Sequence, residues 1–173
     1  MLINFIGAVM ILMAATILGF MKAGKYRERI RELRCLQTAF NMLSSEISYT
    51  ATPVPAAFKK IGSRIDEPIS CFFLKSSQLL DDPSQDDFST IWRRVVKEYF
   101  HQTVLLKSDE DLLLSISSFI GVSDQQHQEK QIKLILHQLE QSEEDALEAM
   151  HKNERMWRYL GVMGGLMLVI LLY

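Results

Sequence analysis

The chain has 173 residues, of which 48% are hydrophobic and 23% charged, and its formal net charge is −2. All of its Lys, Arg, Asp and Glu side chains lie between Lys22 and Arg158, so both ends of the chain are uncharged. On this pattern we exclude a freely soluble protein and a polytopic transporter. The slightly acidic middle segment also excludes a strongly basic nucleic-acid-binding protein. The length suffices for one domain of ordinary size.

Residues 1–21 are predicted to form an N-terminal transmembrane helix. The uncharged run 2–21, as a helix rising about 1.5 Å per residue, spans roughly 30 Å, the thickness of the hydrocarbon core of a bilayer. A cleavable signal peptide would need basic residues before this run, and none are present. Basic residues follow it instead: Lys22, Lys25, Arg27, Arg29, Arg31 and Arg34. The positive-inside rule therefore places the segment after residue 21 in the cytoplasm.

Residues 159–173 are predicted to form a second, C-terminal transmembrane helix. This run also lacks charges and follows Lys152, Arg155 and Arg158. It is shorter than a full span, about 22 Å, and interfacial residues or local thinning of the bilayer would complete it. The alternative is a C-terminal core helix. With two spans, both termini lie outside and the domain between them lies inside.

Small residues spaced four apart occur in both predicted spans. Ala15 and Gly19 lie in the first, and Gly161 and Gly165 form a G-x-x-x-G pair in the second. Small residues let helix backbones approach closely in lipid, so these four positions are predicted to pack membrane helices against each other or against a neighbouring subunit. The alternative is the general abundance of Gly and Ala in membrane helices.

The charged middle, residues 22–158, is predicted to be an all-α domain. Apolar residues with helical spacing occur between 26 and 49, namely Ile30, Leu33, Leu36, Phe40, Leu43 and Ile47. Turn residues separate further helical segments, and we expect Thr52 and Ser108 to cap the second and fifth helices and Ser123 to precede the sixth. Residues 124–160 contain no Pro or Gly, which predicts one long last helix. About six helices joined by short loops form an antiparallel bundle flanked by the two transmembrane helices.

The sequence contains no recognisable catalytic, cofactor or metal site. Residues 19–25 match G-x-x-x-x-G-K, but Tyr26 stands where a phosphate-binding loop needs Ser or Thr. Cys35 and Cys71 form no C-x-x-C pair and are predicted to be free thiols. No histidine has the spacing of a metal-binding pair. We therefore predict no catalytic residue, no cofactor and no metal, and classify the protein as a non-enzyme.

Two acidic clusters leave an alternative open. One comprises Asp81, Asp82, Asp86 and Asp87, and the other Glu143, Glu144 and Asp145. Both are interpreted first as solvated surface and second as docking sites for a basic partner. Converging carboxylates in a cleft would instead indicate a membrane-anchored enzyme or sensor.

Residues along the whole chain resemble the stage III sporulation protein AB family of endospore-forming Firmicutes. The order and spacing of the motifs support the resemblance. In the first half they are Gly19, Lys25-Tyr26, Arg31, Leu33, Leu36, Leu43, Glu46-Ile47, Tyr49, Thr52-Pro53 and Ala57-Phe58. In the second half they are 121–124, Gln131, Leu139, Ala146, Asn153, Met156, 158–161, 165–166 and 168–173.

The resemblance implies a fold, a location and partners. The bundle would be similar to a domain of the type II secretion F protein, an inner-membrane platform. The protein would lie in the mother-cell membrane around the forespore, in a channel that joins the two cells. Its implied partners are the secretion-type ATPase, stage III sporulation protein AA, other membrane and ring proteins of the stage III sporulation A operon, and membrane lipid. A homo-oligomer is left open as an alternative, and no nucleic acid is implied.

Four residues are predicted to contact the ATPase: Glu46, Tyr49, Asp124 and Gln131. They are polar residues beside turns in the motifs that support the resemblance. The leading hypothesis is thus a platform that couples the ATPase to the complex across the envelope. The alternatives are a membrane-anchored scaffold or sensor that makes no ATPase contact, and an uncharacterised enzyme with an acidic cleft.

Overall fold

The computed structural model describes the backbone of residues 2–50, 52–82, 86–120 and 124–172. It describes side chains over 24–48, 52–82, 86–120, 124–153 and at Met156. The chain divides into two compact units, residues 1–28 with 145–173, and residues 29–144. The second is called the bundle unit below.

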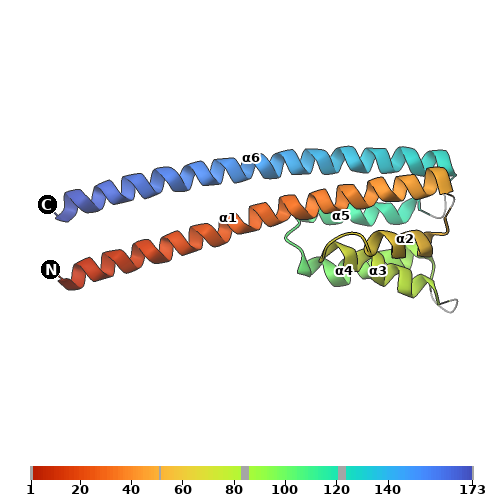
Figure 1. The fold of residues 1–173 in the computed structure, drawn as a ribbon, viewed down its shortest axis with the longest axis horizontal. Coiled ribbons are helices and arrows are strands. Elements are labelled where there is room, and N and C mark those ends of the chain that lie inside the picture. Colours follow the sequence, from red (N-terminus) through yellow and green to blue (C-terminus); the bar gives the residue numbers. More distant parts are fainter. Residues whose placement is uncertain (1, 51, 83–85, 121–123, 173) are drawn as a thin grey trace. The chain divides into compact units, whose positions relative to one another are not determined.

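The described secondary structure is entirely helical, which confirms the predicted all-α class (Figure 1). Helix α1 spans Leu2–Ser45 and is followed by a π-helical turn, Glu46–Thr50. The next four helices are α2 (Val54–Gly62), α3 (Ile69–Leu80), α4 (Phe88–Tyr99) and α5 (Lys107–Ser115). Short 3₁₀ turns follow α4 and α5 at Phe100–Gln102 and Ile116–Ser118. Helix α6 spans Gln125–Leu172, in agreement with the predicted long last helix.

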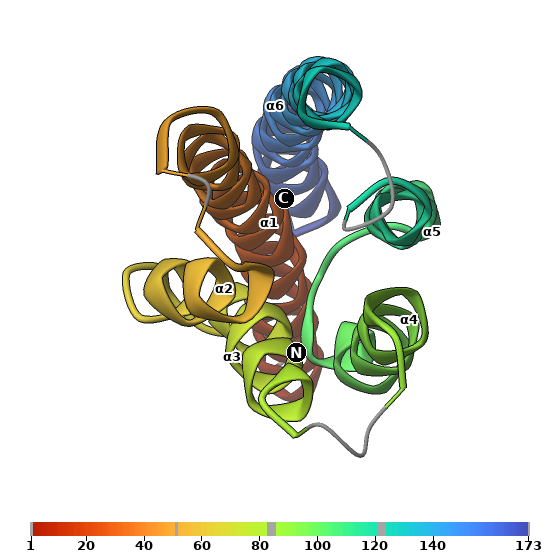
Figure 2. The ribbon, with the colours of Figure 1, turned by 90° about the vertical axis from the view of Figure 1, so that its right-hand side faces the viewer.

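The core of the bundle unit contains the apolar residues of α1 that the helical spacing selected, whereas Ile47, in the π-helical turn, is half-buried. Leu33, Leu36, Phe40 and Leu43 of α1 are almost completely buried. Figure 2 views the helices end on, with α2 beside α3, α3 beside α4, and α4 beside α5, pairings that the packing contacts also give. Each helix therefore contributes one apolar face to a shared interior.

An aromatic cluster fills the part of the core between α2, α3 and α4. Trp92 is fully buried, and its ring centroid lies 5.5 Å from that of Phe58 and 5.7 Å from that of Phe73. Phe88 stacks on Trp92 at 6.2 Å. The indole N–H of Trp92 donates a hydrogen bond of 2.7 Å to the carbonyl oxygen of Leu113, which joins α4 to α5. The polar edge of this large side chain is thus satisfied inside the core.

Helices α2 and α3 pack closely together at Gly62. A Cβ atom at this position would lie 2.6 Å from Cγ of Leu74 and 3.1 Å from the backbone nitrogen of Leu74. The absence of a side chain therefore permits the observed packing of α2 on α3. Gly62 is also the last residue of α2.

Two predicted helix caps are wrong. Helix α2 begins after Pro53 without a side-chain cap, and the hydroxyl of Thr52 donates instead to the carboxylate of Glu46 at 2.9 Å. Helix α5 begins one residue before Ser108, and the carboxylate of Asp109 accepts the N–H of Leu106 at 2.8 Å. Thr52 therefore acts as a donor to a carboxylate, and Ser108 lies inside the first turn of α5, whose capping box uses Asp109. Ser123 lies outside the described residues.

Helix α4 begins at a pH-sensitive hydrogen bond. The Thr90 hydroxyl donates to Asp87 at 2.6 Å and lowers the pKa of this exposed carboxyl below its ordinary value. Because the folded pKa lies below the unfolded one, this stabilisation is present above the unfolded pKa and is lost as the pH falls through the folded pKa. We expect Thr90→Ala to raise the pKa of Asp87, whereas Thr90→Ser should preserve it. NMR titration of the Asp87 carboxyl checks both, and an equal pKa in all three proteins would contradict the assignment.

Among the residues whose side chains the structure describes, no helical segment has the length and hydrophobicity needed to span a bilayer. The predicted transmembrane helices, 1–21 and 159–173, lie where the structure does not describe the side chains. The same holds for the predicted membrane-packing residues Ala15, Gly19, Gly161 and Gly165. The domain boundaries at 21/22 and 158/159 remain predictions.

Candidate functional site

The π-helical turn after α1 and the start of α6 form one end of the bundle unit, here called the bundle end (residues 46–50 and 124–131). The side-chain amide of Gln125 donates to the carbonyl oxygens of Ile47 and Ser48, each at 3.1 Å. The Ser48 hydroxyl donates in turn to Glu129 at 2.9 Å. Figures 1 and 2 both show these two segments side by side. Segments about 80 residues apart in sequence are therefore joined at one surface.

Glu46 lies at the start of the π-helical turn and is mostly buried. Its carboxylate forms an ion pair with Lys60 of α2 and accepts the hydroxyl hydrogen bond of Thr52. Only 11% of its side chain is exposed. A carboxylate engaged in this way positions the end of α1 against α2 and offers little surface to a partner. A π-helical turn adds an extra residue to the helix and is common at functional sites.

The other predicted contact residues differ in exposure. Asp124 is exposed and immediately precedes α6, and its carbonyl oxygen accepts the N–H of Gln128 at 3.0 Å. Gln131 is half-buried on α6. The side chain of Tyr49 lies outside the described ones. The structure thus brings Glu46 and Asp124 to the same end of the bundle, with Gln131 less than two turns further along α6.

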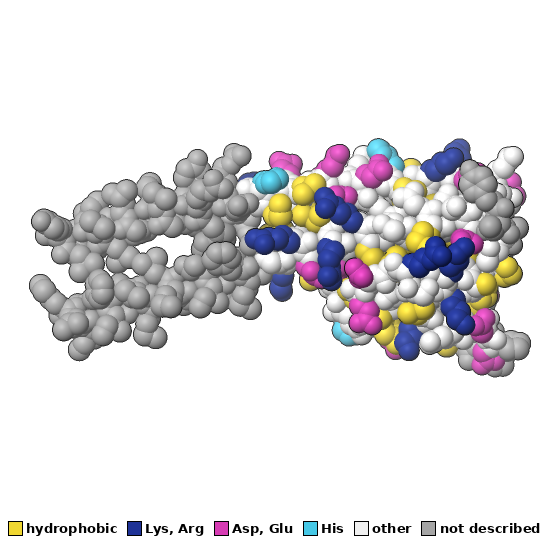
Figure 3. All heavy atoms as spheres, in the orientation of Figure 1, with side chains coloured by type: hydrophobic (Ala, Val, Ile, Leu, Met, Phe, Trp, Pro, Cys, Tyr) yellow, Lys and Arg dark blue, Asp and Glu magenta, His cyan; other side chains and the backbone are white. Residues whose placement is uncertain are grey.

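The predicted acidic clusters contribute to local contacts rather than to a shared site. Asp86 forms an ion pair with Arg94, and Asp87 accepts the hydroxyl hydrogen bond of Thr90. Glu143 of α6 accepts hydrogen bonds from Arg34 at 2.7 Å and from Gln37 at 2.8 Å. Figure 3 shows basic and acidic side chains interspersed over the visible face of the bundle unit. This face does not have a single sign of charge.

The cysteines are free thiols, as predicted. The Cys35 thiol donates to the carbonyl oxygen of Asp66 at 3.8 Å, and burial raises the pKa of this thiol. Within the described part of the chain, no group of three His, Cys, Asp or Glu residues could hold a metal ion.

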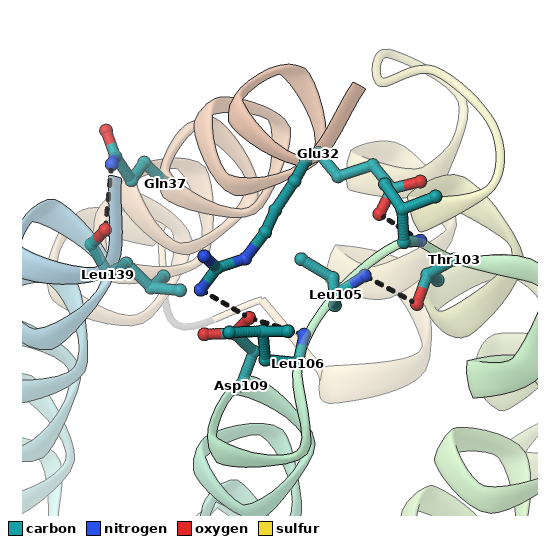
Figure 4. Close-up of polar contacts among 9 residues, drawn as sticks. Glu32, Gln37, Thr103, Leu105, Leu106, Asp109 and Leu139 are labelled. Atoms are coloured by element: carbon teal, nitrogen blue, oxygen red, sulfur yellow. Dashed lines mark hydrogen bonds and ion pairs between the residues drawn. The ribbon is translucent and has the colours of Figure 1, made fainter. Parts of the chain in front are cut away.

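A polar network along α1 is the main feature that sequence reasoning missed. Arg29 forms an ion pair with Asp109 of α5, at 3.2 Å, and Glu32 accepts the backbone N–H of Val104 at 2.9 Å (Figure 4). Gln37 donates to the carbonyl oxygen of Leu139 on α6 at 3.4 Å. The sequence carries one signal for it: Arg29 and Glu32 share the helix face of the buried Leu33 and Leu36.

The fold defines a class of protein: a small all-helical bundle whose first and last helices, α1 and α6, continue beyond the bundle unit. The family model for stage III sporulation protein AB matches residues 4–173. Stage III sporulation protein AB of Bacillus subtilis (strain 168) is 38% identical over 171 residues, which cover 99% of each chain. A solved structure of a stage III sporulation protein AB superposes with a TM-score of 0.67 at 35% identity, covering 72% of this chain and 97% of that one. The chain belongs to the stage III sporulation protein AB family, and is therefore a sporulation protein.

Proposed function

We propose that the protein is a non-enzymatic membrane platform of the channel between mother cell and forespore. In this proposal its bundle resembles the type II secretion F domain and couples a cytoplasmic secretion-type ATPase to the complex across the envelope. Family membership supports a role in sporulation. The platform role, the ATPase and the other operon partners are part of the proposal.

The membrane placement rests on the sequence. Residues 2–21 and 159–173 are uncharged and apolar, and basic residues flank each run on the side of the bundle. The proposal therefore places the bundle in the mother-cell cytoplasm, both termini outside, and the two helices in the membrane around the forespore. Small residues at Ala15, Gly19, Gly161 and Gly165 would allow close helix packing in lipid.

The observation that supports partner docking most directly is the construction of the bundle end. Gln125 joins two segments that are distant in sequence, and Glu46 is held internally by Lys60 and Thr52. Exposed Asp124 then lies on a surface whose backbone is held in place from several sides. Pre-organised surfaces bind with a smaller loss of conformational entropy, which suits a docking site. We propose that stage III sporulation protein AA binds here.

The docking proposal is tested by capturing stage III sporulation protein AA with the full-length protein. A positive charge introduced at the bundle end, by Asp124→Lys or Gln131→Lys, is expected to weaken binding roughly tenfold or more. A charge that meets a like charge, or no partner, in an interface opposes association. The matched control is Glu98→Lys, a charge reversal at an exposed position of α4. It should leave binding unchanged. Unaltered binding in both bundle-end variants would remove the site assignment.

Two further outcomes separate the proposal from its alternatives. Copurification of channel ring proteins without the ATPase would favour a scaffold that makes no ATPase contact.

Topology is tested independently with a cysteine at position 90 in a chain whose Cys35 and Cys71 are replaced by serine. We expect a membrane-impermeant thiol reagent to leave position 90 unlabelled in intact cells. Labelling from outside would overturn the cytoplasmic placement.

A further inference from the structure

The Arg29–Asp109 pair is unusual because it is buried and incompletely hydrogen-bonded. The Asp109 side chain is fully buried, and that of Arg29 is 11% exposed. One oxygen of Asp109, Oδ2, accepts both Arg29 and the N–H of Leu106, whereas Oδ1 and the Nε of Arg29 have no hydrogen-bond partner among the described residues. Desolvation of both charges opposes the attraction between them, so net stabilisation does not explain the pair.

The pair belongs to a set of contacts that attach α1 to the segment leading into α5. Figure 4 shows Asp109 and Leu106 below α1, with Glu32 reaching the same segment one turn away. The Glu32 carboxylate accepts the N–H of Val104, and Thr103 accepts the N–H of Leu105 at 3.4 Å. Each side of this interface thus supplies one carboxylate. Asp109 of α5 pairs with a cation of α1, and Glu32 of α1 accepts a backbone N–H from the segment before α5.

The apolar stripe of α1 alone does not define its axial position well. Leu33 and Leu36, like Phe40 and Leu43, repeat every three or four residues, so a slip of one turn replaces apolar residues by other apolar residues over much of the interface. The charged residues break this near-repeat. Their positions therefore decide which register is lowest in free energy.

Each one-turn slip of α1 is penalised by this arrangement. A slip that brings residue 32 or 33 opposite Asp109 replaces Arg29 by a carboxylate or by an apolar group, and leaves a buried charge unpaired. A slip by four in the other direction supplies Lys25 for Asp109 and Glu28 for the N–H of Val104. It is penalised because it places Arg29 and Glu32 where Leu33 and Leu36 are now completely buried. A slip by three supplies Tyr26, which is not a cation. Each of these registers therefore either leaves Asp109 without a cation or buries charged residues of α1 at apolar positions.

We propose that Arg29, Glu32 and Asp109 form a register lock that selects one axial position of α1 against α5 in the bundle unit. The lock serves mainly to specify a single α1–α5 register and adds less to the free energy of unfolding. This inference is independent of the proposed function, since it concerns one helix pair and no partner.

The test compares a neutral replacement of the whole pair with the single change. In the full-length protein, Arg29→Met with Asp109→Asn, whose side-chain oxygen can still accept the N–H of Leu106, is expected to unfold at the same or a higher urea concentration than the unaltered protein. Arg29→Met alone should lower the folding equilibrium constant roughly a hundredfold or more, because it leaves Asp109 buried and unpaired. A double variant as unstable as the single one would identify the pair as a net stabiliser and overturn the inference.

The α1–α5 register itself is measured as the distance between two spin labels, by double electron–electron resonance. Labels are placed at the exposed positions 45 on α1 and 111 on α5, with Cys35 and Cys71 replaced by serine. We expect one distance population in the parent and an added population displaced by about 5 Å, one helical turn, in the double variant. The matched control is Arg34→Met with Glu143→Leu, an ion pair on the same helix whose arginine is 61% exposed. It should keep one population, and a single unchanged distance in the Arg29/Asp109 variant would refute the lock.

Discussion

Replacement of Trp92 by alanine is expected to destabilise the protein by about 3–5 kcal/mol, the usual cost of removing a large buried aromatic side chain. Trp92 is fully buried and contacts the rings of Phe58, Phe73 and Phe88. The substitution also removes the hydrogen bond to the carbonyl oxygen of Leu113. Because this side chain links α2, α3, α4 and α5, little local rearrangement can fill the space it leaves.

Urea unfolding of the full-length protein, followed by near-ultraviolet circular dichroism, measures this effect. Trp92→Phe preserves a ring but loses the N–H donor, so an intermediate loss is expected. Leu134→Ala is the control, since Leu134 is a large apolar residue that is 51% exposed. It should change the free energy of unfolding by no more than about 0.5 kcal/mol. Equal effects at positions 92 and 134 would contradict the assigned core.

Gly62→Ala is expected to destabilise the protein by about 1–3 kcal/mol, the range found for overpacked cores. Intrinsic helix propensity predicts the opposite sign, because alanine is favoured over glycine in a helix. The new Cβ would lie 2.6 Å from Cγ of Leu74 and 3.1 Å from its backbone nitrogen, so relief requires movement of α2 relative to α3. Packing therefore outweighs propensity at this position.

Gly24 provides a matched control for this substitution. It also lies within a helix, but nothing surrounds the position of its missing Cβ within 4 Å. Gly24→Ala is therefore expected to stabilise the helix by up to about 1 kcal/mol. Thermal unfolding of the two variants beside the parent protein compares the signs. A gain in stability for Gly62→Ala would show that α2 and α3 are less closely packed than described.

Much of the fold was predictable because helix periodicity is a local property. The stripe from Ile30 to Leu43, the end of α2 at Gly62 and the length of α6 follow from spacing and from the positions of Gly and Pro. The capping of α2 was not predictable in this way. The Thr52 hydroxyl donates to Glu46, and this contact depends on where Glu46 lies in three dimensions, which local spacing does not give.

The candidate site was predictable only in part, because its contacts join distant segments. Glu46 and Asp124 were selected by motif, and the structure brings both to the bundle end. Gln125 and Glu129 were not selected, although their hydrogen bonds to residues 47 and 48 hold this end together. The pairing of Arg29 with Asp109, 80 residues away, leaves no trace in local periodicity beyond a charge on an apolar face.

The link between Gln125 and the end of α1 has a consequence for the order of folding. It closes a loop of nearly 80 residues, whereas α2 and α3, or α4 and α5, are neighbours along the chain. Closing a long loop costs more chain entropy than forming local pairs, so the short helices can associate first. During synthesis from the N-terminus, α1 is made first and the last helix of its bundle is made at the end. The face of α1 that α6 covers therefore remains open to other molecules until translation of the chain is almost complete.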